Sequence, residues 1–166
     1  MKAIVAVDRV WGIGKGNDLL FSIPEDMKFF RSTTLNKVVV MGANTLRSFP
    51  NAKPLKNRTN VVLSTTLEDR DDCIVVRDLL ELKKVLKNYP TDDVFIIGGA
   101  MFYKTMLDYC SEIYVTKVDA DGGAQVYFTD LDSLPQWRLK EQSSPLESNG
   151  YKFTFNVYVN SDIKEF

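Results

Sequence analysis

The sequence contains no histidine. This absence excludes Ser-His-Asp and Cys-His nucleophile systems and every histidine-ligated metal site, and no metal is expected. Acid–base chemistry is left to a carboxylate, lysine, tyrosine or cysteine. Cysteine is also scarce, because only Cys73 and Cys110 are present, far apart and without a CxxC pair. Their spacing argues against a disulfide framework or a zinc knuckle and predicts two buried thiols in a reducing cytoplasm.

Long apolar runs are missing as well. No stretch approaches the roughly 18 apolar residues of a membrane span, and the N-terminal residues do not have the pattern of a signal peptide. We therefore expect a cytoplasmic protein that does not bind membranes. An excess of charge is also absent, since 21 Lys and Arg balance 22 Asp and Glu, which disfavours nucleic acid as a partner. A length of 166 residues predicts one domain spanning residues 1–166.

The first two-thirds of the sequence alternate between two kinds of segment. Short runs rich in Val and Ile alternate with segments of helical character. The runs are 3–7, 38–41, 61–63, 74–76 and 94–97, and the helical segments are 25–34, 43–49, 79–86 and 100–107. This alternation predicts an α/β fold whose sheet is mainly parallel and covered on both faces.

The C-terminal third differs, because its strand-like segments, 112–118, 137–141 and 151–159, have no helices between them. In the last segment an apolar set alternates with a more polar one. Period two predicts an antiparallel strand with one buried face. The side chains expected on that face are Tyr151, Phe153, Phe155, Val157 and Val159.

Asp26 stands out among the carboxylates. The preceding Ser22–Glu25 matches a capping box, which predicts a helix start there. Asp26 then falls in the first turn and shares a helix face with Phe30. Two interpretations remain open: Asp26 only complements the helix dipole, or it is a recognition or acid group at the mouth of an apolar pocket.

Three glycine-containing segments are candidates for ligand contact. Trp11–Asp18 reads GxGxG rather than the GxGxxG of dinucleotide sites, so it is either a flexible surface turn or a mobile lid. Val40–Thr45 and Ile96–Met101 each lead from a strand into a helix. Ligands of open α/β sheets bind at such strand ends, and two of them would suit a diphosphate. The alternative is a tight corner with close backbone packing.

Together these segments resemble bacterial dihydrofolate reductase, in register from residue 3 to about residue 159. The resemblance rests on Ala6, Gly12–Gly14, Ile23–Asp26, Phe29–Phe30, Val40–Gly42 with Thr45, Ser48–Pro50, Asn57–Asn60, Ile97–Gly99 and Tyr114–Thr116. It implies an eight-stranded sheet, seven strands parallel and the last antiparallel, with four helices. It also implies a monomer that reduces 7,8-dihydrofolate to tetrahydrofolate with NADPH in one-carbon metabolism and binds antifolate inhibitors.

The resemblance assigns roles to particular residues. Asp26, with Thr116 nearby, would hydrogen-bond the pterin and favour protonation at N5, and Leu19 and Phe21 are the remaining residues assigned to catalysis. Arg58 would bind the α-carboxylate of the substrate's tail. The other substrate-binding candidates are Val5, Ala6, Met27, Phe30, Phe49, Leu55, Ile97 and Tyr103. The cofactor-binding candidates are Ala6, Ile13, Gly14, Asn17, Gly42, Ala43, Asn44, Thr45, Ser64, Thr65, Arg77, Ile97, Gly98, Gly99, Ala100, Met101 and Phe102, with a cis peptide between Gly98 and Gly99.

The sequence also departs from the family pattern. Phe21 replaces the usual Trp, Ala43 replaces an Arg, and Met101 replaces a basic residue. A weaker preference for NADPH over NADH is expected, with Arg77 either supplying positive charge or lying in solvent. Ala124–Val126 replaces Gly-Asp-Thr, which puts a lid contact of that Asp in doubt. The alternatives are a related pterin or flavin-pathway reductase of the same fold and a non-catalytic nucleotide-binding regulatory module.

Overall fold

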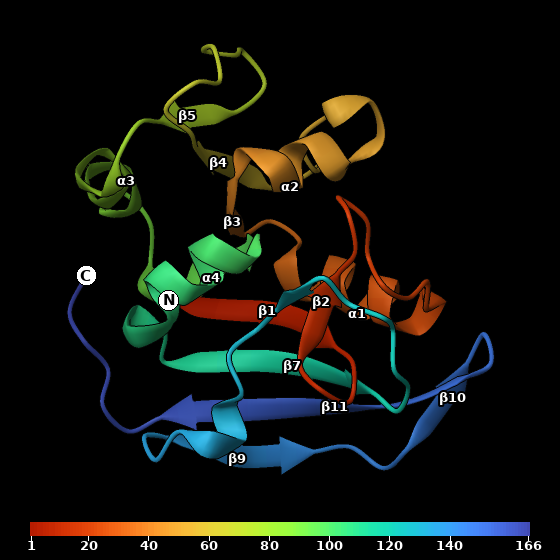
Figure 1. Ribbon diagram of the computed structural model, residues 1–166. Helices are drawn as coiled ribbons and strands as arrows, with labels where there is room; N and C mark the ends of the chain where they lie inside the picture. The colour runs from red at the N-terminus through yellow and green to blue at the C-terminus, as the bar shows by residue number, and fades with distance from the viewer.

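One sheet runs through the computed structural model, which describes residues 1–166. Its strands follow the order β10-β11-β7-β1-β6-β3-β4-β5, and β9 also pairs with β11. Figure 1 shows them stepping from β5 at one end to β9 at the other. The strands are β1 (Lys2–Val7), β3 (Val38–Gly42), β4 (Thr59–Leu63), β5 (Ile74–Val76), β6 (Val94–Gly98), β7 (Glu112–Val118), β9 (Trp137–Gln142), β10 (Leu146–Ser148) and β11 (Tyr151–Asn160).

Strands β9 and β10 share one edge of β11. Trp137 pairs with Asn160 at the start of β9, and Leu146 pairs with Phe153 at the start of β10. The sheet therefore has eight strand positions. Both edge strands and β7 run antiparallel to β11, while all pairings from β7 to β5 are parallel. The predicted α/β fold with one antiparallel strand near the C-terminus is confirmed.

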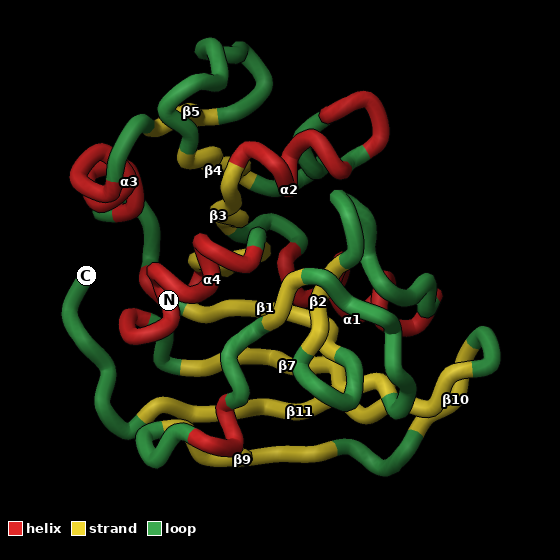
Figure 2. The backbone as a smooth tube through the Cα atoms, in the orientation of Figure 1, coloured by secondary structure: helices red, strands yellow, loops and turns green.

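Four helices cover the two faces of the sheet (Figures 1 and 2). They are α1 (Pro24–Thr34), α2 (Ala43–Ser48), α3 (Leu79–Leu86) and α4 (Ala100–Met106), close to the predicted segments. Alternate residues of β3 enter two different apolar clusters: Val40 packs with α3 and α4, whereas Met41 packs with α1 and α2. Burial on both faces explains why the strand reads as a continuous apolar run. No helix is long and apolar enough to cross a membrane.

The start of α1 corrects the predicted capping box. The N-cap residue is Ile23, and no side chain caps the helix. Pro24 occupies the first turn, where its fixed φ and missing N–H are tolerated. The two polar residues of the box instead contact the β10–β11 turn: Glu25 accepts a hydrogen bond from Ser148 (3.3 Å), and the Ser22 carbonyl accepts one from Asn149 (2.7 Å).

The predicted burial of β11 is wrong for most of the strand. Only Phe153 of the expected apolar face is fully buried, whereas Asn156, Tyr158 and Asn160 on the opposite face are buried. Both faces are covered: Phe155 stacks on Phe29 of α1, with ring centroids 4.6 Å apart, and the other face meets loop residues. Period two in the sequence reveals alternation but cannot show that a second layer covers the polar side.

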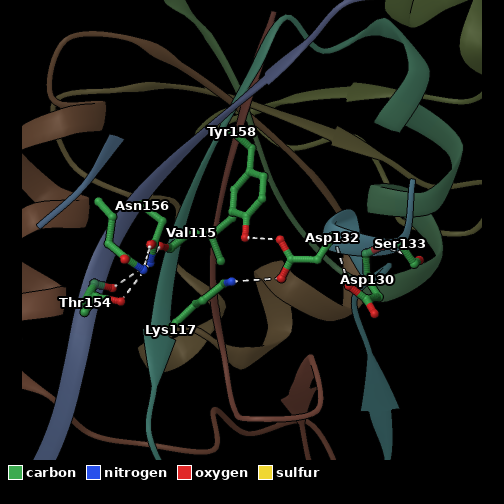
Figure 3. Close-up of polar contacts among 9 residues, drawn as sticks. Val115, Lys117, Asp130, Asp132, Ser133, Thr154, Asn156 and Tyr158 are labelled. Carbon is green, nitrogen blue, oxygen red and sulfur yellow. Dashed lines mark hydrogen bonds and ion pairs between the residues drawn. The ribbon is translucent and has the colours of Figure 1, made fainter. Parts of the chain in front are cut away.

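A polar network covers the face of β11 that carries Tyr158 (Figure 3). The Tyr158 hydroxyl donates to Asp132 Oδ1 (2.7 Å), and Lys117 Nζ lies 3.1 Å from Asp132 Oδ2. Lys117 also lies over the Trp11 ring, 5.0 Å from its centroid. The network therefore joins strands β7 and β11 to the loop that carries Trp11 and to the short helical turn Leu131–Ser133.

The glycine-containing loop is a small sheet rather than a free turn. Strand β2 (Gly12–Gly14) pairs with β8 (Val126–Tyr127). The buried Asp8 carboxylate accepts hydrogen bonds from the backbone N–H groups of Gly12 (2.7 Å) and Gly122 (3.1 Å). Because three backbone donors, including that of Val10 (2.9 Å), converge on it, Asp8 ties the two loops together.

The two thiols differ from the expectation. Cys110 is buried, as predicted, but Cys73 is only half-buried, and both are free. Cys73 lies immediately before β5, a three-residue strand at the edge of the sheet. An edge strand has a neighbour on one side only, which leaves part of the thiol accessible.

We expect Asp8→Asn to lower the free energy of unfolding by about 1–3 kcal/mol, because the amide keeps one acceptor oxygen but points its NH₂ group at the half-buried N–H of Gly122. Urea unfolding measures the change. The matched control is Asp119→Asn, whose carboxylate is exposed beside Arg9 and should leave the midpoint unchanged. Equal midpoints for both variants would contradict this role for Asp8.

Candidate functional site

Asp26 and Thr116 form the centre of the site. Helix α1 carries Asp26 in its first turn, and β7 carries Thr116 opposite Ala6 of β1. The Thr116 hydroxyl donates a hydrogen bond to Asp26 Oδ1, 2.6 Å away. Asp26 makes no salt bridge, so its second oxygen remains available to a ligand. The predicted proximity of the two side chains is confirmed.

Burial raises the pKa of Asp26 above its usual value, and the hydrogen bond from Thr116 opposes that shift. The rise shows that desolvation outweighs the stabilisation of the charged form. A half-buried carboxyl without a cationic partner is typical of a functional site. The interpretation of Asp26 as a mere helix-end charge is therefore disfavoured.

Most of the predicted apolar wall lies together. Ile97 is buried in the cluster on the α1 face of the sheet, and Phe30, Phe49 and Leu55 pack against that cluster. Met27 does not join them, because its side chain is 60% exposed. The four gathered residues form an apolar surface on the same face of the sheet as helix α1.

Val5 and Tyr103 belong to the cluster on the other face of the sheet. The Tyr103 hydroxyl donates to the backbone carbonyl of Ile4 (2.7 Å). Burial raises the pKa of Tyr103 far above its usual value, with smaller contributions from Cys110 and Asp26. Tyr103 therefore stays neutral and supports strand β1, and its hydroxyl is already engaged.

Arg58 carries a positive charge without an anionic partner in the protein. Its guanidinium donates to the Thr34 hydroxyl (3.2 Å) and to the backbone carbonyls of Lys56 (2.9 Å) and Arg31 (3.3 Å). Burial lowers its pKa, and the nearby charge of Arg31 lowers it further. These neutral acceptors hold the group in place and leave its charge for a ligand.

Strands β3 and β6 both end in glycine, but only the glycine of β3 has open space beside it. Met41 pairs with Gly98, which brings Gly42 and Gly98 to the same edge. A side chain added at Gly42 would meet nothing within 4 Å. The peptide between Gly98 and Gly99 is cis, as expected. Gly98 has φ +138°, and the Thr45 hydroxyl oxygen would lie only 2.9 Å from an added Cβ. The open space at Gly42 fits the approach of a dinucleotide diphosphate, whereas glycine is required at Gly98 by its φ and by close packing against Thr45.

The remaining cofactor candidates differ in accessibility. Met101 is 79% exposed, whereas Phe102 is buried in the core. Asn44 accepts a hydrogen bond from Arg47 (3.0 Å), so Arg47 is engaged one helical turn from Ala43. Nearer the glycine loop, Ile13 packs partly against the core and Gly14 is paired in β2. Asn17 and Thr65 are exposed, Ala100 is half-buried, and Ser64 and Arg77 follow adjacent strands.

Arg77 does not lie free in solvent. Its guanidinium donates to the Ser64 carbonyl (3.0 Å) and to the Asp69 carboxylate (2.9 Å). This residue at the entry to α3 is therefore held by the protein, although its side chain remains 36% exposed. Asp69 was not among the predicted residues, because no sequence motif links a loop aspartate to an arginine eight positions later.

Gln125, which was not among the predicted site residues, contacts the glycine-containing loop. Gln125 Oε1 accepts a hydrogen bond from the Gly16 N–H (2.8 Å), and the Gln125 N–H donates to the Gly14 carbonyl (2.8 Å). An amide oxygen accepts an N–H as a carboxylate does, so Gln125 can join the two loops where the family pattern has Asp. Gln125 and the exposed Leu19 line one hollow of about 440 Å³. Phe21 turns instead toward Tyr151, with ring centroids 4.9 Å apart.

The fold and the site together indicate the class of protein. An unpaired carboxyl and an apolar wall lie on one face of a mainly parallel sheet, and a glycine-lined edge for a dinucleotide adjoins them. This arrangement is typical of α/β enzymes that bind a nucleotide cofactor beside a second ligand at the ends of the strands. The family model of dihydrofolate reductase matches residues 1–160. The chain belongs to the dihydrofolate reductase family.

Individual relatives agree with the family match. A dihydrofolate reductase of Schistosoma mansoni is 37% identical over 176 residues, covering 95% of each chain. That of Bacillus subtilis is 30% identical over 158 residues, covering 93% of this chain and 91% of the relative. A solved dihydrofolate reductase from Enterococcus faecalis, complexed with NADP(H) and RAB-propyl, superposes with a TM-score of 0.85. It is 25% identical, and the match covers 97% of this chain and 96% of that one.

We expect Asp26→Asn to raise the midpoint of thermal unfolding at pH 7. The folded state raises the pKa of Asp26, so the charged form costs stability at neutral pH, and this cost disappears as pH falls through the folded pKa. The gain should therefore shrink as the pH is lowered toward 4.

Asp132→Asn is the control, for which we expect the opposite change in the midpoint of thermal unfolding. Burial raises the pKa of Asp132, but the hydrogen bonds from Tyr158 and Lys117 outweigh burial and lower it overall. Loss of the Asp132 charge should destabilise the protein at pH 7, and less so in acid. A lower midpoint for Asp26→Asn at pH 7 would contradict the raised pKa.

Proposed function

We propose that the protein reduces 7,8-dihydrofolate to 5,6,7,8-tetrahydrofolate with NADPH and that Asp26 assists protonation of pterin N5. The overall reaction follows from membership of the family, and the observation that carries the role of Asp26 is its hydrogen bond from Thr116. When bound, NADPH supplies a hydride to C6. The proton added at N5 completes the reduction.

The pterin would lie against Asp26 and the apolar wall. Thr116 holds one carboxyl oxygen, which leaves the other to hydrogen-bond the 2-amino group and the N3 side of the ring. Phe30, Phe49 and Leu55 exclude water from that surface, and exclusion of water raises the pKa of the carboxyl. A carboxyl with a raised pKa holds its proton closer to neutral pH, where it can support protonation at N5.

Dihydrofolate and NADPH would each have one anionic group bound by a different arginine. Arg58 would pair with the α-carboxylate of the dihydrofolate tail, because its guanidinium has no protein anion and a fork geometry that fits a carboxylate. Arg77, with Ser64 and Thr65, would lie beside the 2′-phosphate of the cofactor. The rest of the dinucleotide would cross Gly42, Gly98 and the candidate residues of α2 and α4.

The setting of the enzyme is part of the proposal. We place it in the cytoplasm as a monomer, because its two thiols are free and its edge strand β9 carries Arg138, Lys140 and Glu141, which discourage pairing with a second sheet. The unpaired Asp26 carboxylate would also attract protonated heterocycles, and we expect antifolate inhibitors to bind there. A related pterin reductase or a non-catalytic module would not oxidise NADPH in response to dihydrofolate.

We expect Asp26→Asn to reduce kcat by about 10²–10⁴-fold at pH 7, the usual cost of losing acid–base assistance. The wild-type rate should fall as pH rises through the pKa of Asp26, and this decline should be absent in the variant. Stopped-flow oxidation of NADPH measures both. Asp119→Asn should behave as wild type. A variant rate within threefold of wild type would overturn the role of Asp26.

We expect Arg58→Leu to raise KM for dihydrofolate by about 10–150-fold, the effect of losing a charge-assisted contact of about 1.5–3 kcal/mol. KM for NADPH should hardly change. Steady-state kinetics with each substrate varied provides the measurement, and Arg9→Leu, which removes an exposed charge elsewhere, is the control. If both KM values rise together, Arg58 instead maintains the loop that it crosses.

A further inference from the structure

Arg77 is held by the protein itself. Ser64 follows β4 and Arg77 follows β5, and the parallel pairing of Leu63 with Val76 brings them side by side at the base of the β4–β5 loop, at the top of Figure 1. Guanidinium nitrogen Nη1 donates to the backbone carbonyls of Ser64 (3.0 Å) and Leu67. Both N–H groups of Nη1 are therefore used, and the guanidinium keeps its position without a ligand.

Asp69 accepts one of the remaining N–H groups of the Arg77 guanidinium. Nη2 of Arg77 donates to Asp69 Oδ1, 2.9 Å away. A guanidinium has five N–H groups, and two-point recognition of a phosphate needs two of them in parallel. After the two backbone carbonyls, three remain, and Asp69 holds one. The Asp69 side chain is 88% exposed, compared with 36% for Arg77, so the carboxylate can leave while the arginine stays.

The residues around Arg77 add no unpaired positive charge that would compensate for Asp69. Arg70, on the same loop, is bonded to both carboxylate oxygens of Asp72 (2.9 and 2.8 Å). Glu81 accepts the backbone N–H of Arg77 (2.7 Å) and adds negative charge. Position 43, where the family pattern has arginine, carries alanine. Asp69 therefore pairs with the arginine that we place beside the 2′-phosphate.

We propose that Asp69 is a specificity-determining residue, which competes with the 2′-phosphate of NADPH for Arg77 and narrows the preference for NADPH over NADH. The inference rests on the proposed placement of the 2′-phosphate beside Ser64, Thr65 and Arg77. A phosphorylated cofactor must displace Asp69 or bind with fewer hydrogen bonds and against its charge. A cofactor with a 2′-hydroxyl binds without this cost.

The test is equilibrium binding of NADP⁺ and NAD⁺ by titration calorimetry. Asp69→Asn keeps the side-chain shape and removes the charge. Asp71→Asn is the matched control, because it removes an equal charge from the same exposed loop but makes no bond to Arg77. Asp69→Asn should tighten NADP⁺ binding by about three- to tenfold and change NAD⁺ binding by less than about twofold. The gain should fall as salt is raised, since screening weakens exposed charges.

Arg77→Gln distinguishes the role of Asp69 from the placement of the 2′-phosphate beside Arg77. In this background Asp69→Asn should no longer tighten NADP⁺ binding, because the contested guanidinium is gone. An unchanged ratio of NADP⁺ to NAD⁺ affinity in Asp69→Asn, or an equal effect of Asp71→Asn, would overturn the role of Asp69 while leaving Arg77 at the phosphate. An unchanged ratio in Arg77→Gln would overturn the placement of the 2′-phosphate itself.

Discussion

The hydrogen bond from Thr116 to Asp26 joins the sheet to the first turn of α1, and the candidate site depends on it. Thr116 is held firmly, because β7 is paired with β1 on one side and β11 on the other. Side chains alternate along a strand, so Lys117 points to the opposite face, where it pairs with Asp132 and lies over Trp11. One strand thus positions the carboxyl on one face and supports the glycine loop on the other.

The two candidate ligand-binding arginines illustrate how partners set the availability of charge. Arg58 is held by neutral acceptors only, so its charge is free for a carboxylate. Arg77 is held by carbonyls as well, but a carboxylate shares it. The two guanidinium groups therefore differ in their protein partners: one exposed loop carboxylate, that of Asp69, pairs with Arg77, and no carboxylate pairs with Arg58.

Much of the fold could be predicted from local pattern. The Val- and Ile-rich runs became β3, β4 and β6, and the three-and-four spacing of leucines matched α3 at both ends. Predictions failed where a distant segment supplied the partner. Ser22 and Glu25 contact the β10–β11 turn instead of capping α1, and the polar side of β11 is buried because Trp11 and Asp132 cover Tyr158. Neither partner is near in sequence, so no local pattern could reveal it.

The sequence by itself determined the class of fold and the absence of histidine chemistry, because these follow from composition and periodicity. Its ordered motifs, through the family resemblance, made Asp26 the candidate acidic group. Only the tertiary structure decided the electrostatic state of the site. The pKa of Asp26 is raised by burial and lowered by a hydrogen bond from a residue 90 positions away. The contact between the two loops depends on the hydrogen bond from Gly16 to Gln125. Desolvation and hydrogen bonding are properties of neighbours in space, and only folding brings these neighbours together.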